Sequence, residues 1–289
     1  MIPHIIHYCW IGGNPLPELA EKCIALWRNF MPEWEYRRWD EDSLTRAVNQ
    51  PNPDPCPEGK GVEHSWLDYM PTYVKQAYEA QKYAFVSDYV RLWALEQYGG
   101  LYMDVDFEVY RSFDELMDKY PAFAGYEGSK RKPVMQGVIA SEPHGVWVKD
   151  MLATYEDREF IKADGSLDLT PNTSYFTDRL EAQGFAADGV EKDVYVNDEP
   201  EVQNEPHLQC SMSRDKSLND KVFYLHVFPV HYFCPVLTTG ENVRNEETYC
   251  EHKGESSWAV NNSWKAKVLN WFSPKMKTKL IKLKRRIWG

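Results

Sequence analysis

Long apolar runs are missing from this sequence. No segment reaches the roughly 20 consecutive apolar residues that a membrane-spanning helix needs. The opening residues, MIPHIIHYCW, lack the basic cluster and the apolar stretch of a secretory signal peptide. The six cysteines are scattered without a C-x-x-C pair, which argues against a disulfide framework or a zinc site and favours reduced thiols. We therefore expect a soluble cytoplasmic protein that at most lies on the inner face of the cytoplasmic membrane.

Basic residues are scarce outside the C-terminal segment. The 289 residues include 33 Lys and Arg against 44 Asp and Glu. Residues 264–289 contain nine of the basic residues and no acidic one. The rest of the chain therefore contains 24 basic and 44 acidic residues. A body this acidic is a poor general binder of nucleic acid, and we expect no nucleic-acid partner.

The basic segment 264–289 alternates its cations with aromatic and aliphatic residues in two amphipathic stretches that Pro274 separates. Cations opposite an apolar face are typical of a helix that lies in the surface of an anionic membrane. The alternative is a helix packed on the acidic body with its lysines paired. We favour the membrane interpretation.

The apolar periodicity predicts alternating strands and helices. The predicted strands are 5–11, 36–39, 101–110, 134–140 and 222–228, and the predicted helices are 18–30, 73–98 (one or two helices), 146–155 and 174–183. Residues 50–64 contain four prolines and predict an inserted loop. This alternation indicates an α/β fold with a central, mostly parallel sheet, in one domain of residues 1–263 followed by the tail 264–289.

Two D-x-D patterns occur, and their contexts differ. Asp104-Val105-Asp106 follows a glycine pair on a predicted strand, where alternate side chains share a face and the carboxylates would lie about 6.5–7 Å apart. Carboxylates so close repel each other unless a cation lies between them, and Mg²⁺ or Mn²⁺ is held by carboxylates together with substrate phosphates. Asp40-Glu41-Asp42 is better interpreted as a polar loop or the start of a helix.

The predicted helix before that strand contains a charged pair, Asp88 and Arg91, one turn apart. On an exposed helix such a pair contributes only a few tenths of a kcal/mol. The surrounding residues are apolar almost all round, so the pair is expected to be buried and to need other partners. Sugar hydroxyls and phosphate are suitable partners.

Residues 84–106 combine Ser-Asp-x-x-Arg with Gly-Gly-x-Tyr-x-Asp-x-Asp. This stretch resembles the D-x-D sugar-binding region of family 32 glycosyltransferases and, more distantly, the glucosyltransferase domains of large glucosylating toxins. Residues 2–13 are similar to the first strand of that family, and residues 252–258 to its segment that closes over diphosphate and metal. The resemblance covers residues 1–264 and implies a single Rossmann-like domain of GT-A type with added helices.

The resemblance also implies a role for each matching residue. Trp10 would stack on the base, Asp88 and Arg91 would hold sugar hydroxyls, and Mn²⁺ or Mg²⁺ would be the cofactor. The expected donor-binding residues are Cys9, Trp10, Ile11, Ser87, Asp88, Arg91, Tyr102, Ser257 and Trp258. The expected catalytic residues are Asp104 and Asp106, and the expected metal ligands are Asp106, His252 and Asp104, of which Asp104 is the alternative ligand of ribose or sugar.

The families that the chain resembles retain the configuration at the anomeric carbon. No carboxylate in the sequence can be singled out as a nucleophile, so we expect an acceptor hydroxyl to attack from the same face while the leaving phosphate helps to remove its proton. Gln136, on a predicted strand, is a candidate contact to acceptor or donor. The acceptor-side geometry is not carried over, because residues 50–64 look like an insertion.

These expectations describe a glycosyltransferase that takes a sugar from a nucleotide sugar, with UDP-sugars favoured over GDP-mannose. The acceptor would be a hydroxyl of a glycan or lipid-linked acceptor in polysaccharide biosynthesis, such as capsule assembly. One alternative is a toxin- or effector-like protein glycosyltransferase, which would need delivery segments. Another is a non-catalytic nucleotide-sugar-binding protein, which would be expected to lose an acidic residue at 104 or 106, and both are present.

Overall fold

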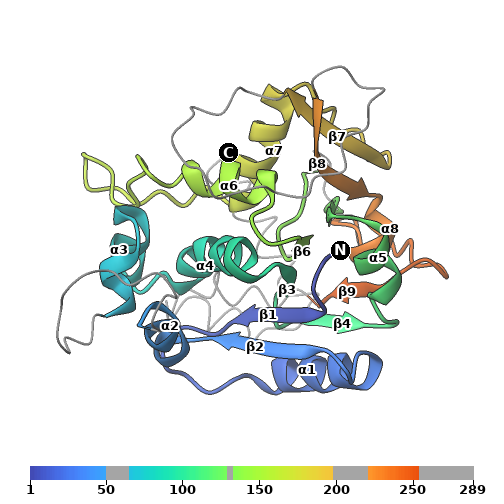
Figure 1. Ribbon diagram of the computed structural model, residues 1–289, viewed down its shortest axis with the longest axis horizontal. Coiled ribbons are helices and arrows are strands. Elements are labelled where there is room, and N and C mark those ends of the chain that lie inside the picture. The colour runs from blue at the N-terminus through green and yellow to red at the C-terminus, as the bar shows by residue number, and fades with distance from the viewer. Residues whose placement is uncertain (50–64, 129–132, 198–220, 254–289) are drawn as a thin grey trace, which may run out of the picture. The chain divides into compact units, whose positions relative to one another are not determined.

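A computed structural model describes residues 1–49, 65–128, 133–197 and 221–253 (Figure 1). The helices are α1 (Glu18–Phe30), α2 (Glu41–Val48), the 3-10 helix η1 (Trp66–Tyr69), α3 (Thr72–Glu79), α4 (Tyr83–Tyr98), α5 (Asp114–Lys119), α6 (Val146–Ala153), α7 (Asn172–Ala182) and α8 (Val230–Phe233). The strands are β1 (Ile5–Cys9), β2 (Glu35–Trp39), β3 (Gly100–Met103), β4 (Phe107–Val109), β5 (Ala122–Gly125), β6 (Val138–Ser141), β7 (Lys192–Asn197), β8 (Lys221–Phe228) and β9 (Cys250–His252).

Seven of these strands form one sheet in the order β2-β1-β3-β6-β5-β8-β7. The pairs β1–β2, β1–β3 and β5–β8 are parallel, whereas β6 is antiparallel to both of its neighbours and β7 is antiparallel to β8. Because β6 reverses the direction twice, β5 and β8 point the same way as β1, β2 and β3. The expected α/β fold with a mostly parallel central sheet is therefore confirmed.

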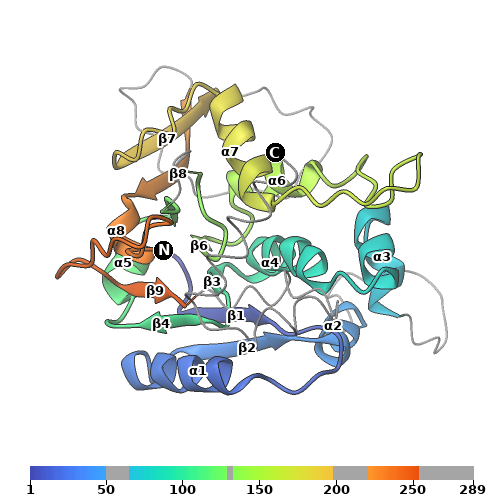
Figure 2. The ribbon, with the colours of Figure 1, turned by 180° about the vertical axis from the view of Figure 1, so that it is seen from behind.

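Alternate side chains of the strands enter two separate cores, one on each face of the sheet. In β3, Tyr102 belongs to the core with α2, α3, α4, α6 and α7, while Leu101 and Met103 belong to the core with α1, α5 and α8. In β6, Ile139 points to the first face and Val138 to the second. Helix α4 packs on β1, β3 and β6, as the two opposite views show (Figures 1 and 2). This burial on both faces explains why the central strands β3, β5 and β6 are apolar at nearly every position.

Most helices lie where the periodicity predicts them. The helix predicted at 18–30 is α1, and the range 73–98 contains α3 and α4, separated at Ala80–Lys82 where Gln81 has φ 56°. Gly99, with φ 61°, ends α4, as the glycine pair predicts. No helix in the described part of the chain is long and apolar enough to cross a bilayer.

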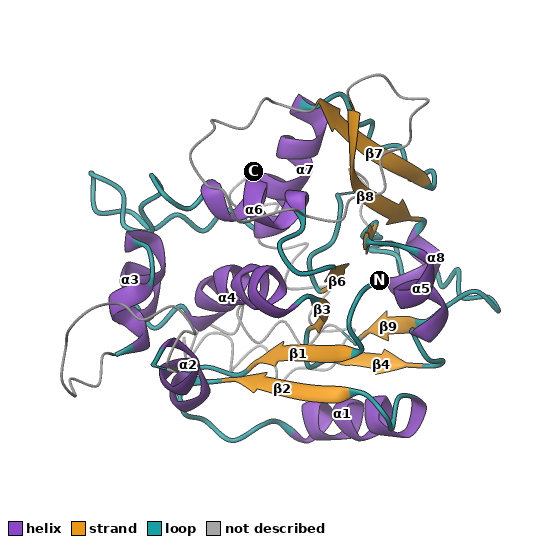
Figure 3. Ribbon diagram, in the orientation of Figure 1, coloured by secondary structure: helices purple, strands orange, loops and turns teal. Residues whose placement is uncertain are grey.

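Two predicted strands are wrong in extent. The strand predicted at 134–140 is confined to β6, and Gln136 lies in a bend before it. The strand predicted at 101–110 is broken: β3 pairs with β1 and β6 in the large sheet, whereas β4 pairs with β9 in a separate two-stranded sheet (Figure 3). The residues between them form a turn in which the Phe107 N–H donates to the Asp104 carbonyl oxygen at 3.2 Å. Asp104 and Asp106 therefore do not share the face of one strand.

Several predictions concern parts of the chain outside the described residues. They are the inserted loop 50–64, the donor-binding roles of Ser257 and Trp258, and the amphipathic tail 264–289.

Candidate donor and metal site

The Asp104 carboxylate lies at the end of β3 and is held by two groups from the sheet and from α4. The Tyr102 hydroxyl donates to Oδ1 at 2.7 Å, and Arg91 Nη2 lies 3.5 Å from the same oxygen. Burial raises the pKa of Asp104, and the Arg91 charge opposes this rise. A Cβ added to Gly137, just before β6, would come within 2.9 Å of Asp104 Oδ2 and of the Phe107 ring, so a larger residue there would displace these side chains. One carboxylate oxygen is thus fixed by the protein.

Arg91 is the centre of a buried polar network on the N-terminal half of α4. Its side chain, 6% exposed, lies 2.8 Å from Asp88 Oδ1 and donates to the Gln136 carbonyl oxygen at 2.6 Å. Its guanidinium also lies over the Tyr102 ring, 4.5 Å from the centroid. Burial raises the pKa of Asp88 to about 6, although the charge of Arg91 works against it. The buried pair therefore has further partners, as predicted. The partners seen in this structure are groups of the protein itself.

Asn172, which the sequence did not single out, joins this network from the start of α7. Its amide nitrogen donates to Asp88 Oδ1 at 2.7 Å and to Gln136 Oε1 at 2.8 Å. Gln136 is fully buried, and its side-chain nitrogen has no hydrogen-bond partner among the described residues. Both bonds to Asp88 involve Oδ1, and no described residue donates to Oδ2. The network therefore leaves one acceptor and one donor for a ligand.

Asp106 and His252 meet although they are 146 residues apart. His252 Nε2 lies 3.1 Å from Asp106 Oδ2, and the Lys253 N–H donates to the Asp106 carbonyl oxygen at 3.0 Å. The β4–β9 pairing places His252 opposite Phe107, on which its ring stacks at 4.8 Å. Burial lowers the pKa of His252, but the hydrogen bond and charge of Asp106 outweigh it and the pKa is raised. Positive charge is therefore stabilised at this position.

The Asp106–His252 pair fits a divalent cation only as part of a ligand set. No group of three His, Cys, Asp or Glu residues suited to a metal ion occurs within the described ranges. Mg²⁺ and Mn²⁺ are commonly held by one or two carboxylates, waters and substrate phosphates, and imidazole is a further acceptable ligand. The carboxylate and imidazole are close enough to share one ion, with the remaining positions left to donor phosphate and water.

Residues 9–11, where β1 ends, lie at the same end of the sheet as Asp104, because β1 and β3 are parallel neighbours. Trp10 is partly exposed, and its indole N–H donates to the Asn14 carbonyl oxygen at 2.6 Å, so it is not an ordinary core residue. Cys9 and Ile11 are buried in the core on the α4 face, and burial raises the pKa of the Cys9 thiol to about 12. Ser87 donates to the Ala84 carbonyl oxygen within α4. Of these residues, Trp10 alone has a partly exposed ring for stacking on a base.

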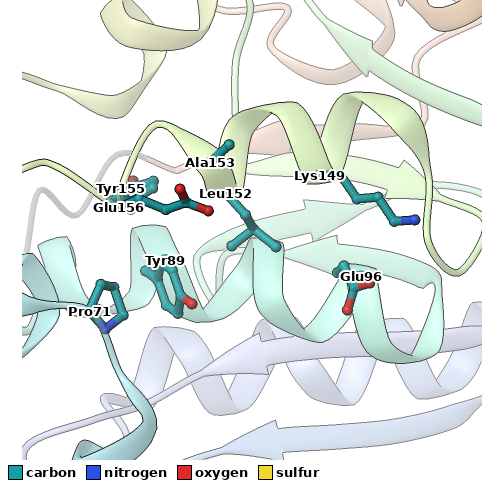
Figure 4. Close-up of a pocket in the computed structure, with 8 residues that line it drawn as sticks. All are labelled: Pro71, Tyr89, Glu96, Lys149, Leu152, Ala153, Tyr155 and Glu156. Carbon is teal, nitrogen blue, oxygen red and sulfur yellow. The ribbon is translucent and has the colours of Figure 1, made fainter. Parts of the chain in front are cut away.

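A groove of about 320 Å³ lies between α4 and α6 on another face of α4 (Figure 4). Leu152 lies near its middle, Pro71 and Tyr89 lie towards one end, and Glu96 and Lys149 lie towards the other. At about 100° per helical residue, Tyr89 and Glu96 point well away from Asp88 and Arg91. The groove is therefore separate from the site described above.

Part of this chain is similar to a known family of enzymes. Residues 17–123, which include Asp88, Arg91, Asp104 and Asp106, match the family model described as "Glycosyltransferase sugar-binding region containing DXD motif". The resemblance to D-x-D glycosyltransferases that the sequence predicts is thereby confirmed.

Several individual proteins are similar to this chain. Inositol phosphoceramide mannosyltransferase 1 of Schizosaccharomyces pombe is 27% identical over 41% of this chain and 32% of its own length. The uncharacterized glycosyltransferase L373 of Acanthamoeba polyphaga mimivirus is 24% identical over 90% of this chain and 84% of its own length. The match spans less than a third of the length of the first of these relatives. Among solved structures, PaToxG glycosyltransferase is 19% identical with a TM-score of 0.43, over 63% of this chain and 69% of that chain.

Proposed function

We propose that the protein is a retaining, metal-assisted glycosyltransferase. It moves a sugar from a nucleotide sugar, with a UDP-sugar favoured, to a hydroxyl of a glycan or lipid-linked acceptor in polysaccharide biosynthesis. The observation that carries the proposal is the contact of buried Arg91 with both Asp88 and Asp104, beside the Asp106–His252 pair. A mannosyl donor is the second candidate, because curated relatives are named mannosyltransferases.

The donor sugar would bind against the network on α4. Asp88 Oδ2, to which no described residue donates, is placed to accept hydrogen bonds from sugar hydroxyls, while Arg91 and Asn172 fix Oδ1. A site whose polar groups are already held in position loses little entropy when the sugar binds.

The diphosphate would bind beside Asp106 and His252, which would hold Mn²⁺ or Mg²⁺. When bound, the metal ion neutralises charge that develops on the leaving diphosphate. Tyr102 and Arg91 both contact the Asp104 carboxylate. We therefore propose that Asp104 mainly orients the donor and contributes less than Asp106 to binding the metal. The Trp10 ring, at the end of β1, would stack on the base.

The donor class is tested by thermal unfolding with Mn²⁺ and a panel of UDP- and GDP-sugars. A ligand present at about 100 times its Kd stabilises the native state by about 2.7 kcal/mol, which raises Tm by roughly 5 °C in a chain of this size. We expect such a shift from at least one nucleotide sugar, and a smaller shift when EDTA replaces Mn²⁺. Stabilisation by no nucleotide sugar would contradict the proposal.

Two other functions predict different results when release of nucleoside diphosphate from the stabilising donor is measured. A non-catalytic nucleotide-sugar-binding protein would show the shift without release of nucleoside diphosphate. A toxin- or effector-like transferase would release it only with a protein acceptor. Turnover of the stabilising donor that depends on a free glycan as acceptor separates both functions from the one proposed.

The basic segment 264–289 supports the further proposal of a cytoplasmic enzyme that lies on the inner face of the cytoplasmic membrane. Each Lys or Arg near an anionic surface contributes about 1 kcal/mol, and the segment contains nine. We expect the full chain to sediment with vesicles that contain phosphatidylserine but not with phosphatidylcholine alone, and deletion of 264–289 to abolish the binding. Equal sedimentation of the truncated chain would show that the tail is not the anchor.

A further inference from the structure

The small sheet of β4 and β9 carries two carboxylates directly opposite each other. Glu108 of β4 pairs with Glu251 of β9, and the next pair along the strands is Phe107 with His252. Because side chains alternate along a strand, the two glutamates lie on one face of this sheet and His252 lies on the other. Like charges directly opposite each other destabilise a strand pair. The strand pair that carries His252 therefore needs a cation on its glutamate face.

Lys253 provides that cation from the residue directly after β9. Its Nζ lies 2.5 Å from Glu108 Oε2 and 2.9 Å from Glu251 Oε1. The Tyr110 hydroxyl also donates to Glu251, at 3.0 Å. The three charged side chains are between 12% and 32% exposed, so solvent and salt screen them less than charges on the open surface. We call Glu108, Lys253 and Glu251 the lysine bridge.

The lysine bridge lies at the end of β9 where packing against the core is weakest. Cys250 at the start of β9 is fully buried, whereas the His252 side chain at its end is 40% exposed. A two-stranded sheet is marginally stable by itself. The Lys253 N–H adds one hydrogen bond there, to the Asp106 carbonyl oxygen at 3.0 Å. Lys253 therefore connects the two strands through both its backbone and its side chain.

The place of His252 depends on this connection. Its ring stacks on Phe107 of β4, and its Nε2 lies 3.1 Å from Asp106 Oδ2 in the turn before β4. Separation of β9 from β4 would therefore carry the imidazole away from the carboxylate. Metal ligands bind an ion tightly only when the residues around them hold them in position. The lysine bridge is thus placed to set the spacing of the two expected metal ligands.

We propose that Lys253 is a positioning residue for the metal site. By joining Glu108 to Glu251 it holds β9 against β4, and so keeps His252 beside Asp106. It acts through the position of His252. The inference rests on the proposed metal-assisted function and adds to it the group that fixes a metal ligand. The sequence alone does not reveal this role, because the register of β4 with β9 decides which glutamates lie opposite each other.

The test compares Lys253→Met with the wild type in the full chain, by calorimetric titration of Mn²⁺ in the presence of UDP or GDP. Methionine keeps much of the apolar length of lysine but leaves the two carboxylates opposed without their cation. Loss of a group that orients a metal ligand typically lowers metal affinity about 10–100-fold, so we expect the Mn²⁺ affinity to fall at least about 10-fold. Lys253→Arg should keep most of the affinity, because it keeps the charge.

A double variant distinguishes this role from a general contribution to stability. Glu108→Gln in the Lys253→Met background removes one of the opposed carboxylates, so we expect the Mn²⁺ affinity to return to within about threefold of the wild type. Lys192→Met is the matched control. Lys192 is also a partly buried lysine on a strand, paired with Asp188 at 2.8 Å, but it lies in β7 at an edge of the large sheet. It should leave the Mn²⁺ affinity unchanged.

Thermal unfolding shows whether each variant is folded at the temperature of the titration. An unchanged Mn²⁺ affinity in Lys253→Met, with or without a lower Tm, would overturn the inference, because the bridge would then stabilise the fold alone. An affinity that stays low in the double variant would overturn it too, since the opposed carboxylates would not be the cause. A wild type that binds no Mn²⁺ with either nucleotide would contradict the proposed function, and this inference with it.

Discussion

Asp106→Asn is expected to lower kcat/KM by about 10²–10³-fold, the usual effect of removing one electrostatic group that stabilises a developing charge. Asparagine keeps the shape of the side chain but removes the charge that lies 3.1 Å from His252 Nε2. The turn should persist, because the Asp106 carbonyl oxygen accepts its hydrogen bond from Lys253 through the backbone. The measurement is donor turnover over a Mn²⁺ titration, in which the variant should need more metal for half-maximal rate.

The other D-x-D pattern supplies the control for this prediction. Asp40 caps α2: its Oδ1 accepts from the Ser43 N–H at 2.9 Å, and its own N–H donates to Ser43 Oγ at 2.8 Å. Asp40→Ala should therefore cost about 1 kcal/mol of stability and leave the rate and its metal dependence unchanged. A rate loss in Asp40→Ala as large as in Asp106→Asn would remove the reason for preferring one pattern over the other.

Local signals in the sequence predicted local structure well. The apolar spacing defines α1, the glycine pair ends α4, and Asp40 is a helix cap as interpreted. These features depend on contacts within one or two turns, which the sequence states directly. The charged pair in an apolar helix likewise predicted that Asp88 and Arg91 would be buried together.

The features that the sequence could not predict depend on contacts between segments that are far apart in the chain. The strand expected at 101–110 breaks after Met103 because its first half pairs with β6, and its second half pairs with β9 about 140 residues later. Asn172 reaches Asp88 across 84 residues. The proximity of His252 to Asp106 was expected, but only through the family resemblance. A single sequence holds no local signal for such contacts.

Arg91→Met is expected to lower the free energy of unfolding by about 3–5 kcal/mol at pH 8, because it leaves buried carboxylates without their cation. Methionine retains much of the length and apolar volume of the side chain. Asp88 Oδ1 loses the partner at 2.8 Å, and Asp104 Oδ1 loses the one at 3.5 Å. Chemical unfolding at several pH values measures the loss, and donor turnover should be abolished in parallel.

The stability loss in Arg91→Met should depend on pH in a defined direction. Burial already raises the pKa of Asp88 to about 6 against the charge of Arg91, so removing that charge raises it further. The folded state then keeps a proton that the unfolded state releases above its ordinary pKa of about 4. Stability falls as pH rises between these two pKa values, and the deficit relative to wild type should therefore be smaller at pH 5 than at pH 8.

A second substitution separates the stabilising part of this network from its functional part. Asp88→Asn in the Arg91→Met background removes one of the two uncompensated carboxylates, so we expect it to recover part of the lost stability and to reduce the pH dependence. Turnover should not recover, because the carboxylate that would accept sugar hydroxyls is gone as well. An equal stability loss at pH 5 and pH 8 would show that Arg91 acts by packing alone. Recovery of turnover in the double variant would show that Asp88 does not bind the donor sugar.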